Sequence, residues 1–222
     1  MSVTAEINDT IAARHLLQHP FYQDWMAGKL TRGDLSRYAG QYAPHVQDFP
    51  RFVSAVHSLC DDPAGRKLLL ENLIDEEGAN GSLPHPELWR QFGAAFGCDT
   101  SAVTREQVGP AARTLVDTFH RLCRSSFAEG LAALYAYEYQ VPEIAAAKIE
   151  GLLKFYGIEK GPATSFFDVH QSADVYHSEA IAQLLNGLDG EARERALRAS
   201  REASQALWDF LTEVHGKHEC AA

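Results

Sequence analysis

Apolar residues recur at helical spacing along nearly the whole chain. The first segment places Ile7 and Ile11 four positions apart, and the last segment repeats this spacing at Ala203, Leu207 and Leu211. Residues at this spacing share one face of an α-helix, whereas a half-buried strand needs strict alternation of apolar and polar residues. No useful length of the sequence alternates in that way. The pattern therefore predicts an all-α chain of roughly seven to nine helices.

Capping and breaking residues predict where the helices begin and end. Thr31 precedes a helix that is expected to open near residues 33–34, and residues 99–101 (Asp-Thr-Ser) are expected to cap another helix. Residues 78–84 and 157–162 combine glycine with proline, so we predict a loop at each of these places.

The chain has no internal repeat and no linker-like segment, so residues 1–222 are predicted to form one domain, with residues 216–222 as a flexible tail.

A formal net charge of −10 disfavours binding to nucleic acid. The sequence shows neither a signal peptide nor an apolar run of roughly 18 residues, so we expect a cytoplasmic protein that does not enter a membrane. The cysteines are expected to be free thiols: Cys60, Cys98, Cys123 and Cys220.

The clearest chemical signal is a triplet of metal-binding residue types near residue 170. His170, Asp174 and His177 stand at positions i, i+4 and i+7, so they share one helix face, with about 10.5 Å along the axis between the outer pair. We expect the two imidazoles to lean toward the central carboxylate and to bind one ion, because two histidines and one carboxylate form a known ligand set for non-haem Fe(II). Taken alone, the triplet is equally compatible with a solvated helix face.

Two further segments supply acidic and imidazole side chains. Carboxylates, Glu76 among them, end the apolar stretch of residues 68–77, and His85 opens the next segment after a glycine-rich loop. Glu138 is the single acidic residue in an apolar stretch of Leu, Ala and Tyr. Burial of an ionised glutamate is costly without a cation, so a metal is one explanation, and a surface position or a hydrogen bond to a tyrosine is the alternative. Pro142 is expected to kink this helix.

Together these residues offer three carboxylates and three imidazoles, enough for two divalent ions held inside a helical bundle: Glu76, His85, Glu138, His170, Asp174 and His177. The ExxH pair of ferritin-like bundles is missing, because neither Glu76 nor Glu138 has a histidine three residues later. The sequence thus predicts a di-metal site of another type.

Several segments resemble the haem-oxygenase-like di-metal oxidases over nearly the whole chain. They are residues 19–22 (His-Pro-Phe-Tyr), 72–77, 137–143 and 148–152, together with the histidine and aspartate triplet. The chain is most similar to the family of the Chlamydia protein associating with death domains (CADD) and its bacterial relatives. The resemblance implies a haem-oxygenase-like helical bundle, related to TenA and PqqC, with the di-metal site at its centre.

The same resemblance implies how the ligands divide between the two ions. Glu76, His85 and Glu138 would hold one metal, and the triplet of residues 170–177 would hold the other, with one glutamate bridging. The metals would be two iron ions or a mixed iron and manganese pair. Glu77 is the alternative to Glu76, because the loop before His85 in this chain need not have the length found in the family.

The resemblance also implies an activity. Proteins of this family make para-aminobenzoate for folate biosynthesis at their own expense, cutting the ring from a tyrosine and taking the amino group from a lysine. Tyr22 matches the ring donor and Lys148 the amine donor, and the reaction would require O₂ and an external electron donor. For a nucleophilic amine the ammonium of Lys148 must lose its proton, which burial favours. Tyr38 and Tyr137 are expected first as core residues and second as relays of electrons or protons.

Three other functions remain open at the level of the sequence. The metals could act on an external small molecule such as an amino acid or a fatty acid. The bundle could instead be a cofactor-independent enzyme of the TenA or PqqC type, or an interaction protein that binds a helical partner. We also expect a homodimer, because bundles of this kind commonly pair.

Overall fold

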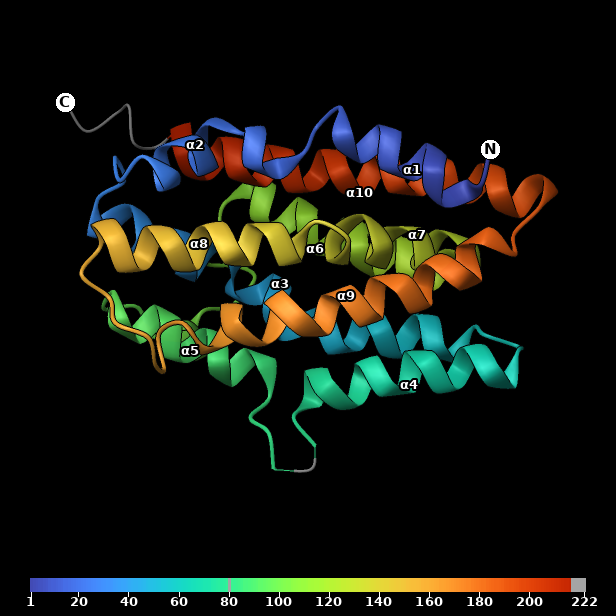
Figure 1. Cartoon of the computed structure of the whole chain (residues 1–222), viewed down its shortest axis with the longest axis horizontal. Coiled ribbons are helices and arrows are strands. Elements are labelled where there is room, and N and C mark those ends of the chain that lie inside the picture. Colours follow the sequence, from blue (N-terminus) through green and yellow to red (C-terminus); the bar gives the residue numbers. More distant parts are fainter. Residues whose placement is uncertain (80, 217–222) are drawn as a thin grey trace.

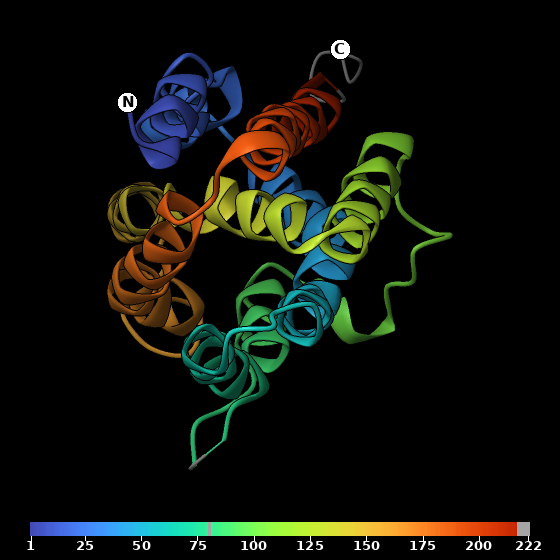
Figure 2. The ribbon, with the colours of Figure 1, turned by 90° about the vertical axis from the view of Figure 1, so that its right-hand side faces the viewer.

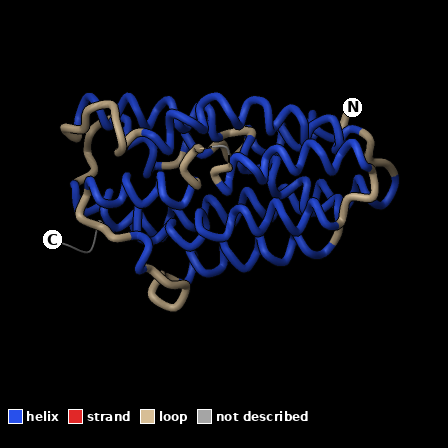
Figure 3. The backbone as a smooth tube through the Cα atoms, turned by 90° about the horizontal axis from the view of Figure 1, so that it is seen from below, coloured by secondary structure: helices blue, strands red, loops and turns tan. Residues whose placement is uncertain are grey.

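The computed structural model describes residues 1–79 and 81–216, and within these ranges it contains helices and loops but no strand (Figure 3). The helices are α1 (Val3–Ala12), η1 (Leu16–Gln18), α2 (Pro20–Met26), α3 (Arg32–Ser58), α4 (Pro63–Glu77), α5 (His85–Ala95), η2 (Thr100–Ala102), α6 (Pro110–Ser125), α7 (Phe127–Glu138), α8 (Val141–Phe155), α9 (Ser165–Asn186) and α10 (Gly190–Gly216). The all-α prediction is confirmed. The described part holds ten α-helices, more than the number expected.

The helix α7 lies inside the bundle. Every residue from Gly130 to Glu138 is buried, and α7 packs against α3, α6, α9 and α10 (Figures 1 and 2). A helix that is apolar on all sides is stable only where other helices cover it. Its C-terminal residue, Glu138, is therefore held in the interior of the molecule.

The predicted kink at Pro142 is instead a complete break between two helices. The helix α7 ends at Glu138, and Pro142 lies in the first turn of α8. Proline has no backbone N–H and its ring collides with the carbonyl four residues earlier, here that of Glu138, so the helix cannot continue. The buried side chain of Gln140 stabilises the break by accepting a hydrogen bond from the backbone N–H of Leu16 at 3.0 Å.

The other predicted boundaries give a mixed result. Thr31 caps α3 through a capping box with Asp34, and residues 157–162 separate α8 from α9, both as predicted. Asp99 caps only the short η2. The next α-helix begins at Pro110, after residues 103–109, so Asp99 does not cap an α-helix. Gly216 is helical, whereas the rest of the predicted tail and Cys220 lie outside the described residues.

Three cysteines are free thiols as predicted: Cys60, Cys98 and Cys123. In the described ranges no helix is both long and apolar enough to cross a lipid bilayer.

Candidate metal centre

Glu76 and His85 meet where α4 ends and α5 begins. The face of α4 that turns inward carries Leu69, Asn72 and Glu76 at helical spacing, and Glu76 is only 2% exposed. His85 is the first residue of α5, as predicted, and its Nδ1 lies 2.9 Å from Oε2 of Glu76. Glu77 points to the surface instead. Of the two alternative glutamates, Glu76 is the one that faces the interior.

His170 completes one group of three. Its ring packs against that of His85 with 4.3 Å between centroids, and its Nε2 lies 4.0 Å from Oε1 of Glu76. One ligand atom from each of these three residues falls within 4.8 Å of the others. Nδ1 of His170 lies 2.6 Å from the backbone oxygen of Phe166, and such a bond fixes the tautomer and leaves Nε2 free for a metal.

Glu138, Asp174 and His177 form a second group beside the first. Nδ1 of His177 is 3.5 Å from Oδ1 of Asp174, and the carboxylates of Glu138 and Asp174 interact electrostatically. Two outer residues hold this group: Nδ2 of Asn72 donates to Glu138 at 2.9 Å, and Nε2 of His177 lies 3.1 Å from Oδ2 of Asp75.

The three residues of the triplet are divided between the two groups. His170 lies with Glu76 and His85, while Glu138 lies with Asp174 and His177. The packing of α4 and α5 against α9 decides this grouping, because it brings Glu76 and His85 to His170, whereas Nδ1 of His177 lies near Asp174.

The buried carboxylates and imidazoles are of the kinds that bind divalent metal ions. All six side chains are at most 4% exposed, and the described part of the chain gives no hydrogen-bond partner to Oε2 of Glu138 or Oδ2 of Asp174. Burial and the neighbouring Asp174 raise the pKa of Glu138. The carboxylates of Glu138, Asp174 and Glu76 repel one another because too little positive charge lies between them. Burial alone would lower the pKa of His85, but the carboxylate of Glu76 outweighs it and raises that pKa. Imidazole and carboxylate donors of this kind suit iron and manganese.

Lys148 and Tyr22 come together on Tyr38 beside this centre. Nζ of Lys148 donates to the hydroxyl of Tyr38 at 2.7 Å, and the hydroxyls of Tyr38 and Tyr22 are 3.4 Å apart. Lys148 and His170 also interact electrostatically. The residues come from α2, α3 and α8, and each is at most 5% exposed.

The surroundings of Lys148 are aromatic. Its Nζ lies 4.9 Å from the ring centroids of Tyr38 and Phe167 and 5.4 Å from that of Tyr22, and no carboxylate pairs with it in the described ranges. Burial lowers the pKa of Lys148 to about 7, in the direction expected from the sequence. A substantial fraction of the amine is therefore uncharged near neutral pH.

Tyr137 lies between the metal centre and the aromatic core. It is buried, it directly precedes Glu138, and its phenol is hydrogen-bonded to that of Tyr42. Tyr42 stacks on Tyr38 with an interplanar angle of 14°. A continuous set of phenols thus joins the tyrosine and lysine pair to the candidate ligands.

Sequence reasoning missed the outer residues Asn72 and Asp75. Asn72 had a readable signal, because it stands four residues before Glu76 and so shares its helix face. Asp75 had none, since its side chain is 55% exposed and contacts His177 only through the packing of α4 on α9.

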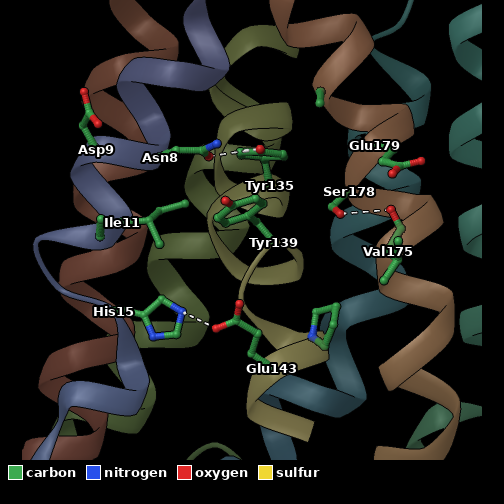
Figure 4. A pocket seen from close by; sticks show the side chains of 13 residues that line it. Asn8, Asp9, Ile11, His15, Tyr135, Tyr139, Glu143, Val175, Ser178 and Glu179 are labelled. Atoms are coloured by element: carbon green, nitrogen blue, oxygen red, sulfur yellow. Dashed lines mark hydrogen bonds and ion pairs between the residues drawn. The ribbon is translucent and has the colours of Figure 1, made fainter. Parts of the chain in front are cut away.

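A surface pocket of about 530 Å³ lies between α1, α7, α8 and α9 (Figure 4). Tyr135 and Tyr139 stack on one another at its centre, and Nε2 of His15 pairs with Glu143 at 3.5 Å. None of the candidate ligands and none of the candidate catalytic residues lines it. We therefore place the chemistry in the closed interior of the bundle.

Known proteins support both the fold and the iron chemistry. Residues 36–208 match the family model described as "Iron-containing redox enzyme". The 4-aminobenzoate synthase of Nitrosomonas europaea is 42% identical over 97% of this chain and 92% of that protein. The 4-aminobenzoate synthase of Chlamydia muridarum is 41% identical over 95% of this chain and 89% of that protein.

Among solved structures, a TenA homologue from Pseudomonas syringae pv. tomato superposes with a TM-score of 0.80 at 18% identity, covering 96% of this chain and 91% of that one. The predicted haem-oxygenase-like fold is thereby confirmed. Since the family model spans most of the chain and the relatives match it nearly end to end, the chain belongs to the haem-oxygenase-like family of iron-containing redox enzymes.

Proposed function

We propose that the protein is an oxygen-dependent 4-aminobenzoate synthase that makes its product from its own Tyr22 and Lys148. The observation that carries the proposal is the contact of both side chains with Tyr38, with Nζ of Lys148 at 2.7 Å and the hydroxyl of Tyr22 at 3.4 Å. The names of the relatives, 4-aminobenzoate synthases at about 40% identity, support the same product.

The chain's own residues would perform distinct tasks in this reaction. Glu76, His85 and His170 would hold one ion, and the second group around Glu138 would hold the other. The bound metals would supply the one-electron oxidation chemistry that activates O₂, with electrons from an external reductant. Tyr38 fixes the amine and the phenol side by side, which replaces an encounter in solution by a preset geometry.

The apolar walls around Lys148 keep its amine partly unprotonated, so that the nitrogen lone pair is available to form a bond to carbon. The same walls exclude water from the tyrosine ring, since Phe21, Tyr22 and Trp25 are all buried.

Isotopic labelling tests the proposal directly. Protein carrying ¹³C-ring tyrosine and ¹⁵N-ε lysine is purified without metal, then incubated with Fe(II), O₂ and a reductant. We expect 4-aminobenzoate that carries both labels, together with a loss of mass located at residues 22 and 148. Unlabelled product, or labelled protein that keeps its full mass while product accumulates, would refute a reaction on the protein's own side chains.

Two phenylalanine variants serve as a matched pair. Tyr22→Phe should form no product while it retains wild-type iron content, because its hydroxyl bonds to Tyr38 and not to a candidate ligand. Tyr139→Phe, which changes an exposed tyrosine at the end of α7, should form product normally.

A further inference from the structure

His45 on α3 is a polar residue in an aromatic cage. Its ring centroid is 4.8 Å from that of Phe119, 5.1 Å from Tyr42 and 5.4 Å from Tyr137. The side chain is 0% exposed, and neither ring nitrogen has a hydrogen-bond partner among the residues that the structure describes. An unsatisfied buried polar atom costs about 1–3 kcal/mol, a cost that phenylalanine would avoid. A local conflict of this kind is typical of a functional position.

On its inner side, His45 faces the phenols that lead to the metal centre. Tyr42 and Tyr137 both contact the His45 ring, and their hydroxyls are hydrogen-bonded to one another. The phenol of Tyr137 interacts electrostatically with Asp174 and Glu76, and that of Tyr42 with Asp174. The two phenols therefore contact the His45 ring and also interact electrostatically with the carboxylates of the centre.

On its outer side, His45 faces a pair that reaches the surface. It interacts electrostatically with Asp48, three residues later on α3, and with His120 on α6. Nε2 of His120 is 2.7 Å from Oδ2 of Asp48, and Asp48 also pairs with Arg51 at 2.7 Å. His120 is partly exposed and the Arg51 side chain is 63% exposed, so this pair exchanges protons with water.

The need for such a path rests on the proposed oxygen-dependent function. Reduction of O₂ to water takes up one proton for every electron; the external reductant supplies the electrons and bulk water supplies the protons. Because all six candidate ligands are buried, protons from bulk water must reach the centre through other side chains.

We propose that His45 carries protons from the His120–Asp48 pair to the phenols of Tyr42 and Tyr137. The imidazole accepts a proton on one nitrogen from the outer side and releases one from the other nitrogen to the inner side, with a water molecule bridging each step, so its charge is restored after each transfer. Burial lowers the pKa of His45 to about 3, so the resting ring is neutral and offers one donor and one acceptor, which a relay requires.

Two variants of the full-length protein test this role. His45→Phe preserves the ring and removes both nitrogens, whereas His45→Gln keeps a donor and an acceptor. We measure the free energy of unfolding of the metal-free protein, the iron content, and the rate at which bound Fe(II) is oxidised by O₂. His45→Phe should be at least as stable as the wild type, bind the same iron, and oxidise it about 100-fold more slowly. His45→Gln should recover part of that rate.

An unchanged oxidation rate in His45→Phe would overturn the inference and assign proton delivery to another route, such as the exposed Asp75 beside His177. A loss of stability in that variant would equally count against it, because the nitrogens would then be satisfied within the core. The Fe(II) oxidation rate is independent of product identity. If the wild type oxidises iron without forming 4-aminobenzoate, the proposed function is refuted. The iron-oxidation rates of the His45 variants would still decide whether His45 carries protons.

Discussion

Lys148 shows how burial of a single side chain can prepare chemistry at a cost in stability. Its pKa falls from 10.5 to about 7 on folding because burial disfavours the ammonium form. Between these two values the unfolded chain binds more protons than the folded protein, so the contribution of Lys148 to the free energy of unfolding rises with pH across this window. Below about pH 7 both states are protonated, and the full penalty is present.

Lys148→Met should therefore remove a destabilising contribution to the free energy of unfolding whose size depends on pH. In metal-free protein we expect the variant to be more stable than the wild type at pH 7, with the difference shrinking by up to about 1.4 kcal/mol per pH unit as the pH rises toward 9. Urea unfolding at a series of pH values measures this. Lys154→Met, which changes an exposed lysine on the same helix, is the matched control. Parallel curves for the wild type and Lys148→Met would contradict the depressed pKa.

Asp75 is the residue whose role depends most on a contact that the sequence does not reveal. Its Oδ2 lies 3.1 Å from Nε2 of His177, which leaves Nδ1 of that ring facing Asp174. Carboxylates that orient a metal-binding histidine typically contribute about 10–100-fold in metal affinity. Asp75→Asn should weaken binding by that factor in a Mn(II) titration, whereas the exposed neighbour Glu77→Gln should bind normally. Equal affinities for the two variants would show that Asp75 has no such role.

At the scale of single residues, the sequence identified which side chains to examine but not how they divide. All six candidate ligands are buried. The sequence had already indicated a cation near Glu138, because burial of an ionised glutamate is costly without one. Helical spacing placed the residues of α9 on one face, yet it could not show that His170 lies beside Glu76 and His85 while His177 lies beside Asp75, because packing between helices decides this. Asp75 and His45 were missed for the same reason, whereas Asn72 shares the helix face of Glu76 and could have been found.

At the scale of helices, the break between α7 and α8 separates the two parts of the site. Glu138 ends α7 and Lys148 lies on α8, so the break places the two residues on separate helices. Both are nevertheless buried near the centre, since Lys148 and Glu138 interact respectively with His170 and Asp174 of α9. A proline in the sequence indicates a boundary, but whether the helix bends or stops depends on the helices that pack around it.

The close packing of α2 on α8 gives a prediction for helix geometry. A Cβ added at Gly151 would lie 2.6 Å from Cδ1 of Trp25, whose ring is 0% exposed and donates to the backbone oxygen of Lys148 at 3.3 Å. Gly151→Ala should force these helices apart and destabilise the protein by about 1–3 kcal/mol in urea unfolding. Gly33→Ala is the control, because its nearest neighbouring atom is 3.6 Å away and the helix gains an alanine. If Gly151→Ala leaves the free energy of unfolding unchanged, Trp25 can move away from the added methyl group at no cost.

At the scale of the whole molecule, the bundle concentrates ionisable groups that conflict with one another until a cation is bound. Burial and Asp174 raise the pKa of Glu138 to about 8. Burial lowers the pKa of His177, but the carboxylates of Asp174 and Glu138 outweigh it and raise that pKa to about 9. Both groups therefore hold a proton at pH 7 in the metal-free protein, although both must be deprotonated to bind a metal.

Metal binding should consequently release protons to solution and depend on pH. With Mn(II), which avoids oxidation by O₂, we expect on the order of one proton released per ion at pH 7, with tighter binding as the pH rises. Above about pH 9 the release should fall toward zero, because Glu138 and His177 have already lost their protons. Calorimetry in buffers of different ionisation enthalpy measures the proton count, and Glu138→Gln should lower it because one titrating carboxyl is removed. Proton release that stays the same from pH 7 to pH 10 would mean that these carboxylates and imidazoles do not meet the ion.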